Sequence, residues 1–146
     1  MLNVKEFIAS QEKEVTDITP FKVNILKSCE NILDESPILD LDDPSRKAIF
    51  SNSLIALDTN ISMLERYYNV TPKIETPTHY AGSQDVISFL EDRMLPTEFV
   101  SSMIFNIVKY TVRLGRKDDE DKEVEKIRIY FTRMKNFIEN GNSLHD

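Results

Sequence analysis

The chain has 146 residues, a net charge of −7, 40% hydrophobic residues, 29% charged residues, three glycines and one cysteine. This composition excludes a fibrous or disordered protein, and an acidic chain cannot coat a nucleic acid through its average charge. A lone cysteine excludes an internal disulfide. The sequence shows neither a signal-peptide pattern nor an apolar run of about 18 residues, so we expect a cytoplasmic protein without a membrane segment.

The first 70 residues predict three helices and contain no catalytic constellation. Apolar residues at helical spacing indicate a peripheral helix that ends near residue 16. Thr19 and Pro20 supply a cap and a first-turn proline for a second helix that ends near Asp34, with Cys29 on its apolar face as a buried, inert thiol. Asp43 and Pro44 repeat this start before a longer third helix. We expect residues 1–70 to form a helical arm or hairpin whose apolar surface serves packing or homo-oligomerisation.

Residues 69–83 include two prolines and a glycine, which indicate an extended connector and place the boundary of a second domain, residues 71–146. After it, Ser83 is a candidate cap for one helix and Thr97 for the next, which Gly115 would end in a left-handed conformation. A last helix spans residues 121–139. The fold class predicted from these patterns is all-α, a helical bundle.

The stretch Asn106 to Lys117 contains four cations and no acid. On the predicted helix, Asn106, Lys109, Arg113 and Arg116 follow at i, i+3, i+7 and i+10 and therefore share one face. Two explanations stay open. Cations favour the negative end of a helix dipole, and arginine and lysine are also the standard ligands of phosphate.

The last helix is predicted to place a second polar stripe beside the first. Its members are Glu123, Lys126, Tyr130 and Arg133. Because the intervening loop is short, the two helices should run antiparallel, and facing stripes would form a polar cleft. The acids before this helix fit N-terminal capping. The alternative is a magnesium site made by Asp118, Asp119, Asp121 and Glu123.

Several of these residues recur together in one known pattern. The runs are Pro77-Thr-His79-Tyr80-Ala-Gly82, Asn106-Ile-Val-Lys109-Tyr110-Thr-Val-Arg113-Leu-Gly115-Arg116-Lys117 and Glu123-Val-Glu-Lys126-Ile-Arg-Ile-Tyr130-Phe-Thr-Arg133. Over residues 75–138 the chain resembles the SaV-like domain of phage proteins. It departs from that pattern at Leu114, Arg116 and Glu123, where the family has a small residue, lysine and aspartate.

The resemblance implies a phage protein that acts on nucleotides in the host cytoplasm. One member of that family phosphorylates deoxynucleoside monophosphates without a P-loop, and this sequence likewise has no P-loop motif. It implies a nucleoside monophosphate kinase using ATP and Mg²⁺, with His79, Lys109 and Arg113 as catalytic residues. The expected nucleotide-binding residues are Tyr80, Asn106, Tyr110, Arg116, Lys117, Lys126, Tyr130 and Arg133.

Two other functions fit the same residues. A non-catalytic binder that sequesters a host nucleotide signal, as an anti-defence protein would, needs cationic clamps and stacking tyrosines but no acceptor geometry. A protein-interaction or inhibitor module would use the acidic N-terminal half instead. All three readings predict a soluble partner, either a phosphorylated small molecule or a protein, rather than a nucleic acid or a membrane.

Overall fold

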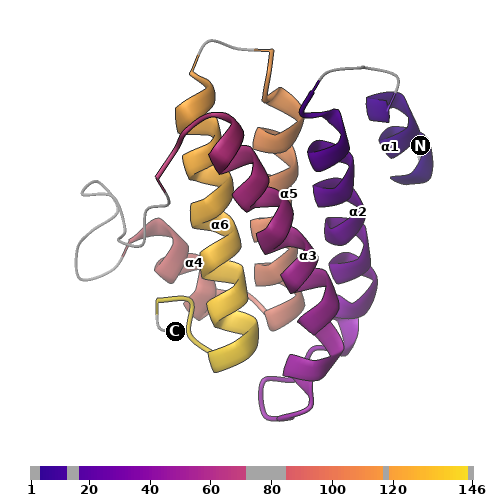
Figure 1. Ribbon diagram of the computed structural model, residues 1–146. Coiled ribbons are helices and arrows are strands. Elements are labelled where there is room, and N and C mark those ends of the chain that lie inside the picture. The colour runs from indigo at the N-terminus through magenta and orange to yellow at the C-terminus, as the bar shows by residue number, and fades with distance from the viewer. Residues whose placement is uncertain (1–3, 13–16, 72–84, 117–118, 145–146) are drawn as a thin grey trace.

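The computed structural model describes residues 4–12, 17–71, 85–116 and 119–144, and most of these residues lie in helices (Figure 1). The fold class predicted from the sequence, all-α, is confirmed within this part of the chain. The elements are α1 (Val4–Glu12), α2 (Thr19–Glu35), the 3₁₀ turn η1 (Ser36–Ile38), α3 (Arg46–Tyr67), α4 (Val86–Arg93), α5 (Pro96–Arg113) and α6 (Glu120–Asn140).

Four of the helices, α2, α3, α5 and α6, form the bundle (Figure 1). Around the bundle, α2 contacts α3, α3 contacts α6, α6 contacts α5, and α5 contacts α2. The short helix α1 lies against α2, and α4 contacts α5. The end of α5 and the start of α6 lie at the same end of the bundle (Figure 1). This arrangement brings the two predicted polar stripes together.

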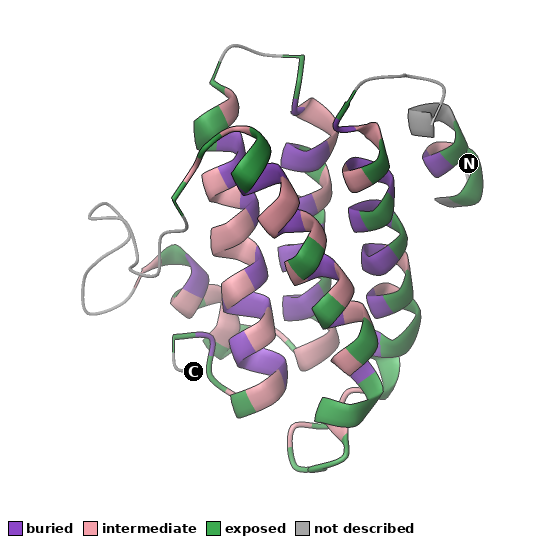
Figure 2. Ribbon diagram, in the orientation of Figure 1, coloured by how far each residue is buried: buried purple, intermediate pink, exposed green. Residues whose placement is uncertain are grey.

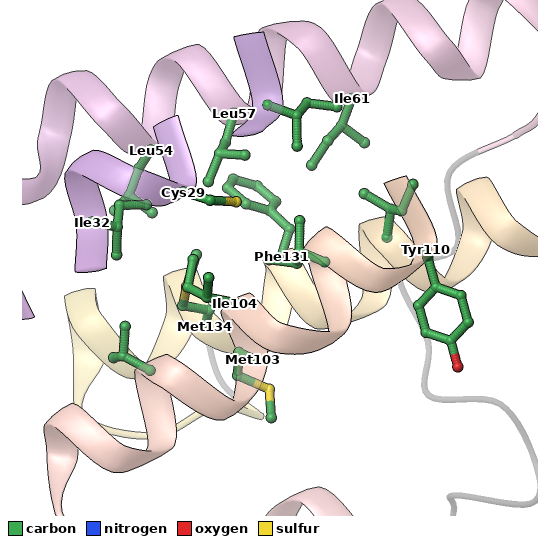
Figure 3. Close-up of a cluster of buried hydrophobic side chains, with 14 of the residues drawn as sticks. Cys29, Ile32, Leu54, Leu57, Ile61, Met103, Ile104, Tyr110, Phe131 and Met134 are labelled. Atoms are coloured by element: carbon green, nitrogen blue, oxygen red, sulfur yellow. The ribbon is translucent and has the colours of Figure 1, made fainter. Parts of the chain in front are cut away.

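One hydrophobic core joins both halves of the sequence. It includes Ile25 and Cys29 from α2, Leu57 from α3, Phe99 from α5 and Phe131 from α6. Phe131 is 1% exposed and points among side chains from the neighbouring helices (Figure 3). Burying a side chain of this size contributes about 1.5–3 kcal/mol. The predicted N-terminal hairpin, α2 with α3, is therefore a wall of the common bundle.

The buried face of each bundle helix matches its sequence period. Figure 2 shows buried residues recurring along α2, α5 and α6; those between them are largely exposed on α2 and largely intermediate on α6. Cys29 is 1% exposed, and desolvation raises the pKa of its thiol far above the usual range. A thiol that stays protonated is a poor nucleophile, which agrees with the inert thiol predicted from the apolar pattern.

Helix starts differ from the predicted ones by one or two residues. Thr19 and Thr97, predicted as caps, lie inside their helices, since Ile18 and Leu95 hold the cap positions. In α5 the side chain of Glu98 accepts a hydrogen bond from the Leu95 backbone N–H at 2.8 Å, which is the acidic half of a capping box without the hydroxyl half. Pro20, predicted at the first helical position, is the second residue of α2, and Pro96, predicted in the turn before Thr97, is the first residue of α5.

The start of α4 is set by Asp85, whose carboxylate accepts the Ser88 backbone N–H at 2.7 Å. Ser83, the predicted cap, lies outside the described residues, as do residues 13–16 of the predicted first helix. Helix α3 has 22 residues, and it begins at Arg46, after the predicted Asp43 and Pro44. Among the described residues, no helix combines the length and apolar character that a membrane span requires.

Candidate functional site: a basic and aromatic cluster between two helices

The end of α5 contains one of the strongest stop signals in the chain. Gly115 has a φ of +87°, a left-handed conformation that costs glycine little and other residues more. Lys22 from α2 is buried and donates its ammonium hydrogen to the Leu114 carbonyl oxygen at 2.8 Å. Both features fix where α5 ends, so that α6 returns antiparallel and its first turns face the last turns of α5.

Tyr110 is the centre of the contact between the two stripes. Its ring lies 6.0 Å from the ring of Tyr130 on α6, with the planes 15° apart, as in a stacked pair. Tyr110 is 9% exposed and lies at the edge of the hydrophobic core, with its hydroxyl directed away from Phe131 (Figure 3). The ring therefore joins the core to the surface between α5 and α6.

Three cations surround this ring. The Lys126 ammonium nitrogen lies 4.9 Å from the Tyr110 ring centroid, the Lys109 ammonium nitrogen 5.2 Å, and the Arg113 guanidinium carbon 5.7 Å. Distances within about 6 Å allow a cation–π attraction. We call Lys109, Tyr110, Arg113, Lys126 and Tyr130 the basic–aromatic cluster. The predicted meeting of the two polar stripes is confirmed at these residues.

The charge of this cluster is only partly balanced. Arg113 approaches the Glu123 carboxylate, with 3.4 Å between Nη2 and Oε1. Within the described parts of the chain, neither Lys109 nor Lys126 has a carboxylate within ion-pair distance. Two unbalanced lysines beside one ring, in a chain of net charge −7, form a local site where an anion would be stabilised.

Three buried polar atoms at the end of α5 and the start of α6 have no hydrogen-bond partner among the described residues. They are Arg113 Nε, Glu123 Oε2 and Thr111 Oγ1. The Glu123 side chain is 6% exposed and that of Arg113 is 36% exposed. Buried polar atoms are paired in the great majority of cases, so Arg113 Nε and Glu123 Oε2 have capacity for a further hydrogen-bonding group, whether water or ligand.

Arg133, predicted as a nucleotide ligand, is engaged elsewhere. Its guanidinium donates to both oxygens of Asp85 at 2.9 and 3.2 Å, to the Ser88 hydroxyl at 3.0 Å and to the Ser143 hydroxyl at 2.9 Å. Desolvation would raise the pKa of Asp85, but hydrogen bonds from Arg133 and Ser88 outweigh it and lower the pKa. Arg133 thus ties α6 to the start of α4 and to the chain after α6.

Two other predicted members of the first stripe also differ from expectation. Asn106 is half-buried and donates its amide to the Ser102 carbonyl oxygen at 3.0 Å, one turn earlier on α5. Arg116 is exposed and lies in the turn beyond Arg113, where α5 ends, so the helical spacing that placed it on the stripe does not apply. The stripe on α5 therefore reduces to Asn106, Lys109 and Arg113.

Four predicted site residues, His79, Tyr80, Lys117 and Asp118, lie outside the described residues. For the predicted magnesium site, Asp119 and Asp121 are exposed at the start of α6, while Glu123 is buried beside Arg113. No three carboxylates, histidines or cysteines of the described residues lie close enough together to hold a metal ion.

Sequence reasoning missed a second arginine on α6. Arg128 donates to Glu65 at 2.7 and 3.0 Å, to Asp58 at 2.6 Å and to the Ser62 hydroxyl at 3.1 Å. Desolvation would lower the pKa of Arg128, but the hydrogen bonds from its guanidinium to Glu65 and Asp58 raise it. This network joins α6 to α3, and the helical period marks Arg128 only as a residue off the apolar stripe.

Comparison with known proteins places the cluster in a matched region. A family described as a protein of unknown function (DUF3310) matches residues 74–132, a stretch that includes α4, α5 and the first part of α6. All five residues of the basic–aromatic cluster, and Glu123, fall within it. No curated protein and no solved structure matches the chain.

Proposed function

We propose that the protein binds a nucleotide through the basic–aromatic cluster and acts as a nucleoside monophosphate kinase without a P-loop. The observation that supports binding is the pair of lysines, Lys109 and Lys126, which lie about the same tyrosine ring without a carboxylate partner in the described residues. The proposal of catalysis rests on the resemblance to the SaV-like domain. The description of the family that matches residues 74–132 names no activity.

In the proposed complex, Lys109 and Lys126 hold phosphate oxygens as point charges, and the positive charge of Arg113 lies beside them. The kinase reaction transfers the terminal phosphoryl group of ATP to a phosphate oxygen of the monophosphate and yields ADP and a nucleoside diphosphate. Little covalent chemistry is required of the protein, because positioning and charge neutralisation supply most of the rate in phosphoryl transfer. Magnesium, when bound with ATP, would neutralise charge on the transferring group.

The test is the incubation of the purified protein with ATP, magnesium chloride and each deoxynucleoside and ribonucleoside monophosphate, followed by anion-exchange chromatography. We expect one or more diphosphates to form, and the Lys109→Ala with Lys126→Ala double variant to form none while keeping its circular dichroism spectrum. Tight binding without any diphosphate would refute the kinase and leave the sequestering binder. In that case, denaturation would return the bound nucleotide chemically unchanged.

A specific surface favours protein binding as the second candidate. An apolar hollow of about 470 Å³ lies between α2 and α5, and Leu33, Ile104, Phe105 and Val108 contribute to its lining. Phe105 is 67% exposed beside it. An exposed aromatic next to an apolar hollow is typical of helix-in-groove contacts and of self-association. Light scattering of the wild type and of Phe105→Ser tests the predicted homo-oligomer, which a monomeric wild type would contradict.

A further inference from the structure

The pair formed by Arg113 and Glu123 has an open edge. A guanidinium and a carboxylate in a two-point pair use Nε and Nη2 against both carboxylate oxygens. Here Nη2 lies 3.4 Å from Oε1, whereas Nε and Oε2 are both buried and without a partner among the described residues. One donor and one acceptor are therefore left over on the same ion pair.

The chemistry of these two atoms restricts what can join them. A group between them must accept a hydrogen bond from the Arg113 Nε–H and donate one to the Glu123 Oε2. An ionised phosphate oxygen only accepts and would be repelled by the carboxylate, whereas an ammonium only donates and would be repelled by the guanidinium. A hydroxyl does both.

The position of the pair relative to the cluster connects the hydroxyl to the ligand. The same Arg113 guanidinium lies 5.7 Å from the Tyr110 ring centroid, and Lys109 and Lys126 lie about that ring as well. The Arg113 side chain is 36% exposed and that of Glu123 is 6% exposed, whereas the Arg113 Nε and Glu123 Oε2 atoms are themselves buried, so a ligand hydroxyl reaches them only when the Arg113 side chain moves aside. A ligand on the cluster would thus have its hydroxyl near its phosphate.

We propose that the Arg113–Glu123 pair recognises a sugar hydroxyl of the nucleotide whose phosphates bind Lys109 and Lys126. This inference rests on the proposed function and deepens it, because it assigns Glu123 as the residue that distinguishes hydroxyl-bearing sugars. Removal of the hydroxyl leaves a buried donor and a buried acceptor unpaired, which a binding site penalises more than a lost apolar contact.

The test compares ligands that differ in this hydroxyl. Isothermal titration calorimetry measures the dissociation constants of ribonucleoside, 2′-deoxynucleoside and 2′,3′-dideoxynucleoside monophosphates that share the best-binding base. We expect the dideoxy compound to bind the wild type about tenfold or more weakly than the best hydroxyl-bearing compound, the effect of a hydrogen bond to a charged group.

Glu123→Gln should lower this ratio of dissociation constants severalfold. The hydroxyl would then accept a hydrogen bond from the neutral Gln NH₂ group in place of donating one to a charged carboxylate, and a bond to a charged group is the stronger of the two. Glu125→Gln, two residues along α6 and on a different face, should keep the wild-type ratio. If Glu123→Gln does not fold, Arg113→Lys provides the same comparison, because it removes the Nε–H and should also lower the ratio.

Two results would overturn the inference, and they are distinguishable from each other. Tight binding of all three compounds with equal affinity would mean that water occupies the open edge, and the proposed function would stand. No binding of any nucleotide by the wild type would refute the proposed function and the recognition of a sugar hydroxyl with it.

Discussion

Replacement of Arg133 by methionine should strongly destabilise the bundle. The side chains of Arg133 and Asp85 are 5% and 4% exposed, so the variant would leave the Asp85 carboxylate buried without its cation. Removing one partner of a buried ion pair costs about 3–5 kcal/mol, far more than the pair adds over an apolar replacement. For a domain of this size, 1 kcal/mol shifts the melting temperature by about 3 °C, so the variant should melt roughly 10 °C lower.

A second substitution separates the charge from the other contacts. Asp85→Asn removes the buried charge but keeps a side-chain oxygen that can cap α4 at Ser88. The double variant Asp85→Asn with Arg133→Met should therefore have a free energy of unfolding at least about 1 kcal/mol higher than that of Arg133→Met alone. The assay is urea unfolding followed by circular dichroism at 222 nm.

Lys135→Met is the matched control on the same helix. The pair formed by Lys135 and Glu139 spans 3.0 Å, with side chains 39% and 32% exposed. An exposed pair of this kind contributes about 0.5 kcal/mol or less. Two results would refute the conclusion that Arg133 neutralises a buried carboxylate. One is an equal loss of unfolding free energy in Arg133→Met and Lys135→Met, and the other is no gain in stability when Asp85→Asn is added to Arg133→Met.

Three further predictions concern stability. Gly115→Ala should lower the free energy of unfolding by about 1 kcal/mol, because its φ is +87°, and chemical denaturation measures the loss. Folding lowers the pKa of Asp85, so the stability that its carboxylate adds to the fold is fully present above the unfolded pKa, about 4, and is lost as the pH falls through the folded pKa. Between pH 6 and pH 2 the melting temperature of Asp85→Asn should therefore fall less than that of the wild type. Phe131→Ala, at a site 1% exposed, should cost about 3–5 kcal/mol in urea titrations. Melting behaviour of Asp85→Asn that parallels the wild type, or a loss below 1 kcal/mol for Phe131→Ala, would contradict the structure.

The bundle itself was predictable because its signals are local. Pro20 lies in the first turn of α2, Gly115 follows the end of α5, and the apolar period on α6 marks a buried face that includes Phe131. A one-residue error in a cap changes little, since the packing of the apolar stripes decides which helices meet. The meeting of Lys109 with Lys126 followed from the short turn at Gly115 and the antiparallel return of α6.

The remaining features depend on contacts that the helical period does not encode. The stripe on α6 contains Lys126 and Arg133, yet Lys126 faces Tyr110 while Arg133 is bound by Asp85, 48 residues earlier in the chain. Arg116 was assigned to the stripe because the helix was extended past its actual end at Arg113. Glu123 had been considered as a metal ligand, and only the structure pairs it with Arg113.

The central claim is that the basic–aromatic cluster binds the phosphates of a nucleotide. The most direct measurement is calorimetric titration of the wild type and of the Lys109→Ala with Lys126→Ala double variant with nucleoside monophosphates and ATP at two salt concentrations. We predict saturable binding by the wild type that weakens with salt, and a loss of about tenfold or more in the double variant. Equal affinity of the two proteins, or no binding by the wild type, would contradict the claim.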